Sequence, residues 1–408
     1  MKKHIIALMT IFITSCILAG EWTTYNSKTC DGFATGTVNE MCEDSSGNMW
    51  FAIRKGGSNP EGGAVKFDGY EWSTLDTTNS GLVNNDVMTI CVGKDNEMWY
   101  GTQTKGVSHF DKHGWHTFDM FNDTTVLIWT MFRDSKDRVW VGTAQGGLMY
   151  YSDSMWTTFD PWVVPDKGVS TFYEDKNGLI YVAMNSDCGI RIYNGTSWRT
   201  MDTADGLPSN FVHVIYEDSK GRVWYGTGNG AAVYDNGSWN YFDTSNAPFW
   251  KNYIASICED PNGDMWFIAF YTSSKYGAFC YDGRDWTTYT NDNTNGGLLT
   301  PRLVYKDSKD YLWFASDSGA SRYKVYVPIV SKHSPYNQEK IVSSITCNQI
   351  MLTDRRCQVS TIYNLHGRLL KKFNKNVLDI SDLAAGNYLL RVEYSGRKVF
   401  QNIFNVIR

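Results

Sequence analysis

The chain has 408 residues, 15% of them aromatic, and a formal charge of −5 at neutral pH. The charge is uneven, because residues 341–408 carry +6 and residues 21–340 are left near −13. A strongly acidic body repels phosphate backbones, so the composition excludes nucleic acid as the partner.

Residues 1–20 are typical of an export signal. Two lysines precede an apolar run from Ile5 to Leu18, and small residues follow it just before Glu21. The run is short for a membrane span, and the pattern predicts a cleaved signal peptide on a secreted or outer-surface protein. The alternative is a lipoprotein, in which Cys16 carries the lipid.

Residues 21–325 contain seven copies of one sequence unit. Each copy is centred on an aromatic residue, and successive centres are 49, 41, 41, 43, 42 and 47 residues apart. This period, with alternating apolar and polar residues rich in Val, Ile, Tyr, Trp and Thr, predicts four short strands in each copy. The central aromatics are Trp50, Trp99, Trp140, Tyr181, Trp224, Trp266 and Trp313.

An Asp stands six residues before most of the central aromatics, and a Gly or a polar residue follows it three residues later, as with Asp218 and Gly221. An Asp that bonds backbone amides, followed by a residue that tolerates positive φ, is typical of a tight hairpin turn. One role repeated along the chain suits a scaffold, so we interpret these acids as turn residues and not as catalytic groups.

The first and last copies complete each other. Earlier copies end in a strand that begins with Trp, such as Trp156, but the last copy leaves the pattern after Tyr323. The sequence of the missing closing strand, Trp-Thr-Thr-Tyr, occurs at residues 22–25. The N-terminal strand is therefore predicted to complete the seventh unit and close a ring, which removes exposed sheet edges. The predicted fold is all-β, a seven-bladed β-propeller that we expect to be monomeric.

The fifth copy contains Asp205-Gly206-Leu207-Pro208, then Glu217-Asp218, Trp224 and Gly226-Thr227. In these residues it resembles the two-component-regulator propeller repeat. The fourth copy departs most from that pattern. In the family, the repeats often form periplasmic sensor domains of membrane histidine kinases, thought to recognise glycans. The resemblance implies the propeller fold, but with no kinase following in this chain the sensor role is not carried over.

Residues 326–340 break the repeat and indicate a linker, and residues 341–408 predict a small C-terminal β-sandwich. The tail contains Tyr-x-Leu-x-Gly-Arg at 363–368 and Asp-Ile-Ser-x-Leu-x-x-Gly-x-Tyr at 379–388. It is similar to the C-terminal sorting domain of the type IX secretion system. The resemblance implies that the type IX machinery exports the protein through this tail, which is then removed. The alternative is a generic adhesive sandwich.

No Cys-x-x-Cys pair occurs, which argues against a zinc site of that kind. Cys42, Cys91 and Cys258 share one inner-strand position of the repeat, and we interpret them as small core residues. Cys347 and Cys357 are predicted to lie on neighbouring strands of the tail. In an oxidising compartment they are the candidate disulfide.

Three histidines, His109, His113 and His116, fall on a hairpin expected at the outer part of the second blade. His-x₆-His spacing across a hairpin is one way to hold a metal, but we interpret the segment as a solvated turn and expect neither a metal nor a cofactor. No nucleophile elbow, zinc-protease motif, phosphate loop or calcium loop occurs, so no catalytic residue is nominated.

The candidate ligand site is the mouth of the central channel. Loops there are irregular while the turns of the opposite face repeat, and function usually sits where repeats differ. Flat aromatics beside Arg and Asn suit stacking on sugar rings and hydrogen bonds to hydroxyls, and equally suit a peptide. The alternative is that the aromatics only plug the channel. The candidates are Asn39, Trp129, Trp162, His213, Trp250, Tyr253 and Arg302.

The sequence therefore favours a secreted or cell-surface binding protein without catalysis, whose ligand is a glycan or an extracellular protein. One alternative is a propeller enzyme, either similar to the streptogramin lyases or glycan-degrading. His213 and Arg302 are then the only nominated pair, although two blades separate them, and an acid within hydrogen-bond reach of His213 favours this alternative. Another alternative is a purely structural surface component.

Overall fold

The computed structural model describes residues 21–325 and the strands between residues 342 and 406. Residues 21–325 form one compact unit, and the tail belongs to another. The expected signal segment and linker lie outside the described residues. No helix of the described part is long and apolar enough to cross a lipid bilayer. The gaps within the first unit are 56–60, 120–125, 146, 161–167, 185 and 270–275.

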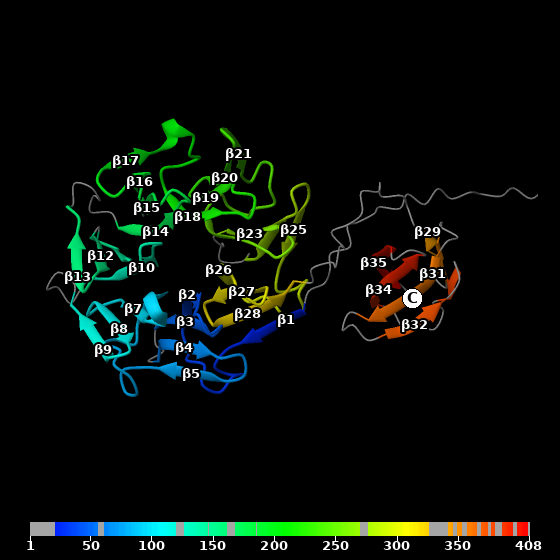
Figure 1. The fold of residues 1–408 in the computed structure, drawn as a ribbon, viewed down its shortest axis with the longest axis horizontal. Coiled ribbons are helices and arrows are strands. Elements are labelled where there is room, and N and C mark those ends of the chain that lie inside the picture. Colours follow the sequence, from blue (N-terminus) through cyan, green and yellow to red (C-terminus); the bar gives the residue numbers. More distant parts are fainter. Residues whose placement is uncertain are drawn as a thin grey trace, which may run out of the picture. The chain divides into compact units, whose positions relative to one another are not determined.

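The first unit consists of seven four-stranded antiparallel sheets arranged around a centre (Figure 1). The first three contain β2 (Thr37–Glu43), β3 (Met49–Arg54), β4 (Gly63–Phe67), β5 (Trp72–Leu75); β6 (Val87–Val92), β7 (Met98–Thr102), β8 (Val107–Asp111), β9 (Gly114–Phe118); and β10 (Ile128–Arg133), β11 (Val139–Thr143), β12 (Leu148–Ser152), β13 (Met155–Thr158).

The next three sheets contain β14 (Val169–Glu174), β15 (Ile180–Met184), β16 (Ile190–Tyr193), β17 (Trp198–Met201); β18 (Val212–Glu217), β19 (Val223–Thr227), β20 (Gly230–Asp235), β21 (Ser238–Phe242); and β22 (Ile254–Glu259), β23 (Met265–Ala269), β24 (Ala278–Tyr281), β25 (Trp286–Tyr289). The seventh contains β26 (Pro301–Lys306), β27 (Tyr311–Ser316), β28 (Gly319–Lys324) and β1 (Glu21–Tyr25). Short 3₁₀ turns are η1 (Lys94–Asn96) and η3 (Thr203–Asp205). The prediction of an all-β, seven-bladed propeller is confirmed.

The N-terminal strand closes the ring. β1 pairs antiparallel with β28 from Glu21 opposite Lys324 to Tyr25 opposite Ala320, and Figure 1 shows dark-blue β1 beside yellow β28. Trp22 anchors this strand, because its ring lies 4.5 Å from that of Tyr323. The prediction that the missing strand comes from the other end of the chain is confirmed.

The repeated Asp links each turn to the core. In the fifth blade, Asp218 Oδ1 accepts hydrogen bonds from the backbone amides of Lys220 and Arg222, and Oδ2 accepts from Trp224 Nε1 at 2.8 Å. Trp224 is 1% exposed, so the carboxylate ties a surface turn to a buried ring. The same indole bond is made by Asp44, Asp134, Asp260 and Asp307. These carboxylates therefore have a structural role within the blades.

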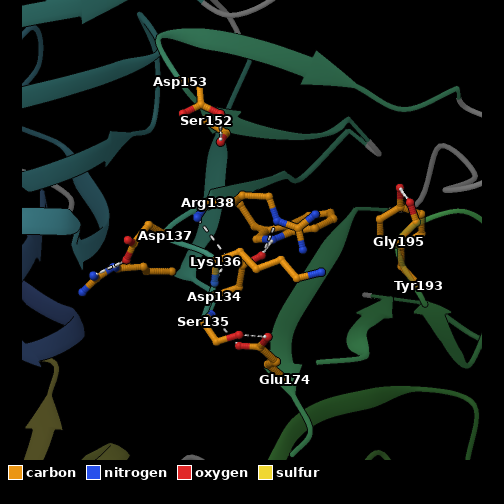
Figure 2. A network of polar contacts seen from close by, with 12 residues as sticks. Asp134, Ser135, Lys136, Asp137, Arg138, Ser152, Asp153, Glu174, Tyr193 and Gly195 are labelled. Atoms are coloured by element: carbon orange, nitrogen blue, oxygen red, sulfur yellow. Dashed lines mark hydrogen bonds and ion pairs between the residues drawn. The ribbon is translucent and has the colours of Figure 1, made fainter. Parts of the chain in front are cut away.

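Polar contacts also join successive blades. Ser135, next to the Asp of the third blade, donates its amide and its hydroxyl to Glu174 of the fourth blade, both at 2.6 Å (Figure 2). A charged acceptor strengthens such bonds. Equivalent contacts join Ser219 to Glu259 and Ser308 to Glu43. The last pair connects the seventh blade to the first and so reinforces the closure made by β1.

The tail is all-β in its described part. β29 (Val342–Ile345), β30 (Gln349–Leu352) and β33 (Val377–Asp379) form a three-stranded sheet, and β32 (Leu369–Phe373), β31 (Cys357–Asn364), β34 (Gly386–Tyr394) and β35 (Lys398–Val406) form a four-stranded sheet. The packing of the two sheets as a sandwich stays a prediction. So does the disulfide between Cys347 and Cys357, because Cys347 lies outside the described residues.

Candidate functional site

A β-bulge interrupts the first strand of every blade. The register between the first and second strands shifts by one residue at the same place in all seven sheets. A bulged residue leaves the ladder, and the bulge redirects its side chain. The residues skipped by the register are Asn39, Met88, Trp129, Ser170, His213, Ala255 and Arg302.

Six of these bulges surround a cavity of about 690 Å³ at the centre of the ring, and Met88 does not line it. Its wall is formed mainly by the first strands of six blades, β2, β10, β14, β18, β22 and β26, with Tyr253 just before β22 and the end of β23. The volume is in the range of ligand sites, roughly 300–1,000 Å³. Among the residues expected at the site, the cavity is lined by Asn39, Trp129, His213, Tyr253 and Arg302.

The other two candidates are not among the cavity-lining residues. Trp250 packs edge-on against Phe279, with ring centroids 5.2 Å apart, and its ring lies against Gly277. It therefore belongs to the packing of the sixth blade. Trp162 lies outside the described residues.

His213 is a neutral ring in an aromatic setting. It stacks on Tyr253 with centroids 3.9 Å apart, and Phe211 meets it edge-on at 4.2 Å. Burial lowers the pKa of His213 to about 4. Its Nε2 is buried and has no hydrogen-bond partner among the described residues, so no described carboxylate orients the ring as a catalytic base.

The polar groups at the mouth are held in place by the scaffold. Asn39 Nδ2 donates to the carbonyl of Met88 at 2.6 Å, bridging the first two blades. Arg302 Nε lies 2.6 Å from Asp317 Oδ1, a charge contact whose angle falls outside hydrogen-bond geometry. Trp129 differs from these, because its half-buried ring makes no ring contact with a described residue. It is the tryptophan among the cavity-lining residues.

Glu40 is a cavity residue that sequence reasoning missed. It follows the bulged Asn39 and lines the cavity, and its Oε2 accepts a hydrogen bond from Thr89 Oγ1 at 3.2 Å. Burial raises the pKa of Glu40 to about 7, and the Thr89 bond offsets this only in part. The sequence signal that could have identified Glu40 is its position directly after Asn39, one of the seven bulged residues.

Glu40 makes stability depend on pH. Because its folded-state pKa is raised from 4.5 to about 7, the stabilisation from protonated Glu40 is fully present below pH 4.5 and is lost as pH rises through about 7. We expect Glu40→Gln to raise the free energy of unfolding at pH 8 by about 2 kcal/mol, allowing for water in the channel, and to change it little at pH 5. Urea titrations at the two pH values measure this. An equal effect at both would contradict the assignment.

Two clusters of ligand-type side chains lie away from the cavity. One consists of Glu97, His109 and Asp111 in the second blade. The interpretation of that hairpin as a solvated turn is wrong for His109, which is 4% exposed and stacks on Trp99 with centroids 3.8 Å apart. The other cluster consists of Asp260, Asp264 and Cys280 in the sixth blade.

Comparisons with known proteins agree on the fold. The family model described as two component regulator propeller matches residues 206–229, and no curated protein sequence matches the chain. The extracellular domain of the hybrid two-component system BT3049 from B. thetaiotaomicron is similar in structure, with 17% identity, a TM-score of 0.62, and coverage of 95% of this chain and 57% of that one.

Two other solved structures are also similar. PorZ, a surface component of the type IX secretion system of Porphyromonas gingivalis, has 17% identity and a TM-score of 0.58 over 91% of this chain and 60% of PorZ. Virginiamycin B lyase from Staphylococcus aureus has 14% identity and a TM-score of 0.57 over 75% of this chain and the whole lyase. The chain thus spans less than two thirds of BT3049 and PorZ. At these identities the likeness shows the fold alone: a seven-bladed β-propeller with a two-component-regulator propeller repeat at residues 206–229.

Proposed function

We propose that the protein binds a ligand in the central cavity of the propeller and performs no chemistry on it. The observation that carries this proposal is the series of bulges, because six of the seven place a different residue at one cavity on a uniform scaffold. On a scaffold of similar repeats, ligands are usually recognised by the positions at which the repeats carry different residues.

A glycan is the ligand class that this cavity suits best. Trp129 offers an uncovered ring, and the stacked His213 and Tyr253 form a second flat wall. Aromatic faces take the apolar faces of sugar rings, while amide and guanidinium groups such as those of Asn39 and Arg302 bond hydroxyls. A peptide is the second choice, because the same groups also fit aromatic side chains and backbone amides.

The histidine nominated for catalysis gives no support to a lyase, although a lyase shares the fold. The one histidine on the cavity wall, His213, has no hydrogen-bond partner at Nε2 within the described part of the chain, and burial lowers its pKa to about 4. A general base near neutral pH works best with a pKa close to the operating pH. The proposal is therefore binding.

Glycan and peptide arrays test this proposal. We expect the full-length chain to retain one class of glycan, and we expect Trp129→Ala to lose it. Tyr70→Ala serves as the matched control, because Tyr70 is 93% exposed and is not a cavity residue. Retention that is unchanged in Trp129→Ala would contradict the cavity as the site.

The second part of the proposal concerns export. The type IX secretion machinery is the proposed partner of residues 341–408, with residues 1–20 as the signal for the inner membrane and the cell surface or medium as the destination. This rests on the sequence motifs of the tail. Two proteins of similar fold, described as an extracellular domain and as a surface component, are in keeping with it.

Deletion of residues 341–408 is expected to leave the propeller in the periplasm of a bacterium with a type IX system, whereas the full chain reaches the surface or the medium. Cell fractionation followed by immunoblotting measures the distribution. Transfer of the same residues to a periplasmic reporter is the complementary control, and the reporter should then leave the cell. Export of the truncated chain at the full-length level would contradict the sorting role.

A further inference from the structure

We propose that the second blade binds a divalent transition-metal cation of the zinc class through Glu97, His109, Asp111 and His116. This site lies apart from the cavity and does not rest on the proposed function. Two imidazoles and two carboxylates make a donor set that suits zinc and its neighbours.

The fold brings these side chains together on one hairpin and the strand next to it. β8 and β9 pair so that His109 stands directly opposite His116, and their ring centroids are 5.6 Å apart. β7 lies on the other side of β8, and Glu97 precedes it at the end of the η1 turn. Antiparallel pairing therefore fixes the positions of both rings on one face of the blade.

The distances suit a shared cation. His109 Nε2 lies 3.3 Å from Glu97 Oε2, and His116 Nε2 lies 3.1 Å from Asp111 Oδ1. One ligand atom each from Glu97, His109 and Asp111 lies within 4.8 Å of the others. Ligand atoms about 2.0–2.2 Å from a tetrahedral zinc are roughly 3.3–3.6 Å apart, so a small contraction would bring Glu97, His109 and Asp111 to one ion. His116, which contacts Asp111, is the proposed fourth ligand.

The other blades explain why a cation belongs here. In four of them a basic side chain of the protein lies over the ring of the central Trp, at 5.1 to 5.6 Å from its centroid. In the fourth blade, the charge of Arg199 acts to lower the pKa of the central Tyr181. The four basic residues over Trp rings are Lys66, Arg138, Arg222 and Arg322.

The second blade lacks the basic residue at both positions. Glu97 stands two residues before its central Trp, where Arg138 and Arg222 stand in their blades. His109 pairs with Trp99 as Lys66 and Arg322 pair with their tryptophans. The sites that carry protein cations elsewhere thus carry a carboxylate and an imidazole here.

The turn of this blade has also lost its Asp. Gly93 takes that place, and Trp99 Nε1 is buried without a hydrogen-bond partner in the described part. A Cβ at Gly93 would lie 3.3 Å from Glu97 Oε2 and 2.6 Å from Trp99 Nε1. The Glu97 carboxylate therefore fits in this blade because the scaffold Asp is absent, which frees the position for a ligand.

Asp111 is oriented by the backbone amide of His113, which donates to its Oδ1 at 2.7 Å.

The cluster in the sixth blade does not carry the same inference. It has no imidazole, and Asp260 already accepts from Trp266 and from two backbone amides. Burial strongly raises the pKa of the Cys280 thiol, which disfavours the thiolate needed for coordination.

Titration calorimetry with zinc chloride, on the full-length chain without a histidine tag, tests the site. We expect one ion per chain, with binding weakened at least about tenfold in His116→Ala and in Glu97→Gln. His113→Ala is the matched control, since His113 is an exposed histidine of the same hairpin, and it should bind as the wild type does.

Circular dichroism of each variant checks that the propeller is folded, and both test residues lie at the partly exposed side of the cluster, which favours folding. Absence of zinc binding by the wild type would overturn the proposal. So would equal affinity in His116→Ala and His113→Ala, because a surface histidine alone would then account for the binding.

Discussion

Asp218→Ala is expected to lower the free energy of unfolding of the propeller by about 3–4 kcal/mol. The change leaves Trp224 Nε1 and the amides of Lys220 and Arg222 without their acceptor, and removes the partner of the Arg222 guanidinium, whose Nε lies 2.7 Å from Asp218 Oδ2. Each buried donor left unpaired is destabilising by about 1–3 kcal/mol. Urea titration followed by circular dichroism measures the loss.

Asp243→Ala is the matched control. Its carboxylate also organises a turn, through the amide and hydroxyl of Ser245, but the residue is partly exposed and bonds no buried ring. The control should lose far less stability. If both variants unfolded at the same urea concentration, the bond to the buried indole would not be what stabilises the blade.

The loss caused by Asp218→Ala should depend on pH. Burial acts to raise the pKa of Asp218, but the bonds from Trp224 and Arg222 outweigh it, and the net pKa lies below 3.8. A depressed folded-state pKa gives stability that is present above pH 3.8 and lost as pH falls through the folded-state value. The gap between wild type and variant should therefore shrink in strong acid.

Trp129→Ala is expected to weaken ligand binding by about thirtyfold, which corresponds to about 2 kcal/mol. Trp129 is the tryptophan that lines the cavity, and large central aromatics dominate binding energy at such sites. Biolayer interferometry with the ligand retained on the arrays gives the dissociation constants.

Two variants make this result specific to the open ring. Trp129→Phe should recover part of the affinity, because a smaller ring still stacks. Trp250→Ala removes a Trp that packs on Phe279 and does not line the cavity, so its folded fraction should bind as the wild type does. Equal losses in Trp129→Ala and Trp250→Ala would indicate a general effect on the blades.

Much of the ring is predictable from the sequence because the repeat encodes its own geometry. A fixed offset from the central aromatic locates the same place in every blade, so the amino-acid pattern alone puts Asn39, His213 and Arg302 at one mouth of the channel. The closing strand is predictable for the same reason, because the strand sequence that is missing after Tyr323 is found at Trp22 instead.

Other features depend on contacts that no repeat encodes. Trp250 was expected at the cavity, but the loop that holds it folds back onto Phe279. The raised pKa of Glu40 comes from burial, which the hydrogen bond from Thr89 of the next blade offsets only in part. His109 was expected in solvent, but the ring of Trp99 covers it. In each case the outcome is set by tertiary contacts with residues outside the local sequence pattern.

A crystal structure of the full-length chain with its array-selected ligand tests most directly whether the central cavity is the binding site. We predict ligand density in the cavity between the bulged residues, with one ring of the ligand stacked on Trp129 and polar groups near Asn39 and Arg302. Density confined to the outer hairpins of the blades, with the cavity unchanged, would contradict binding in the cavity.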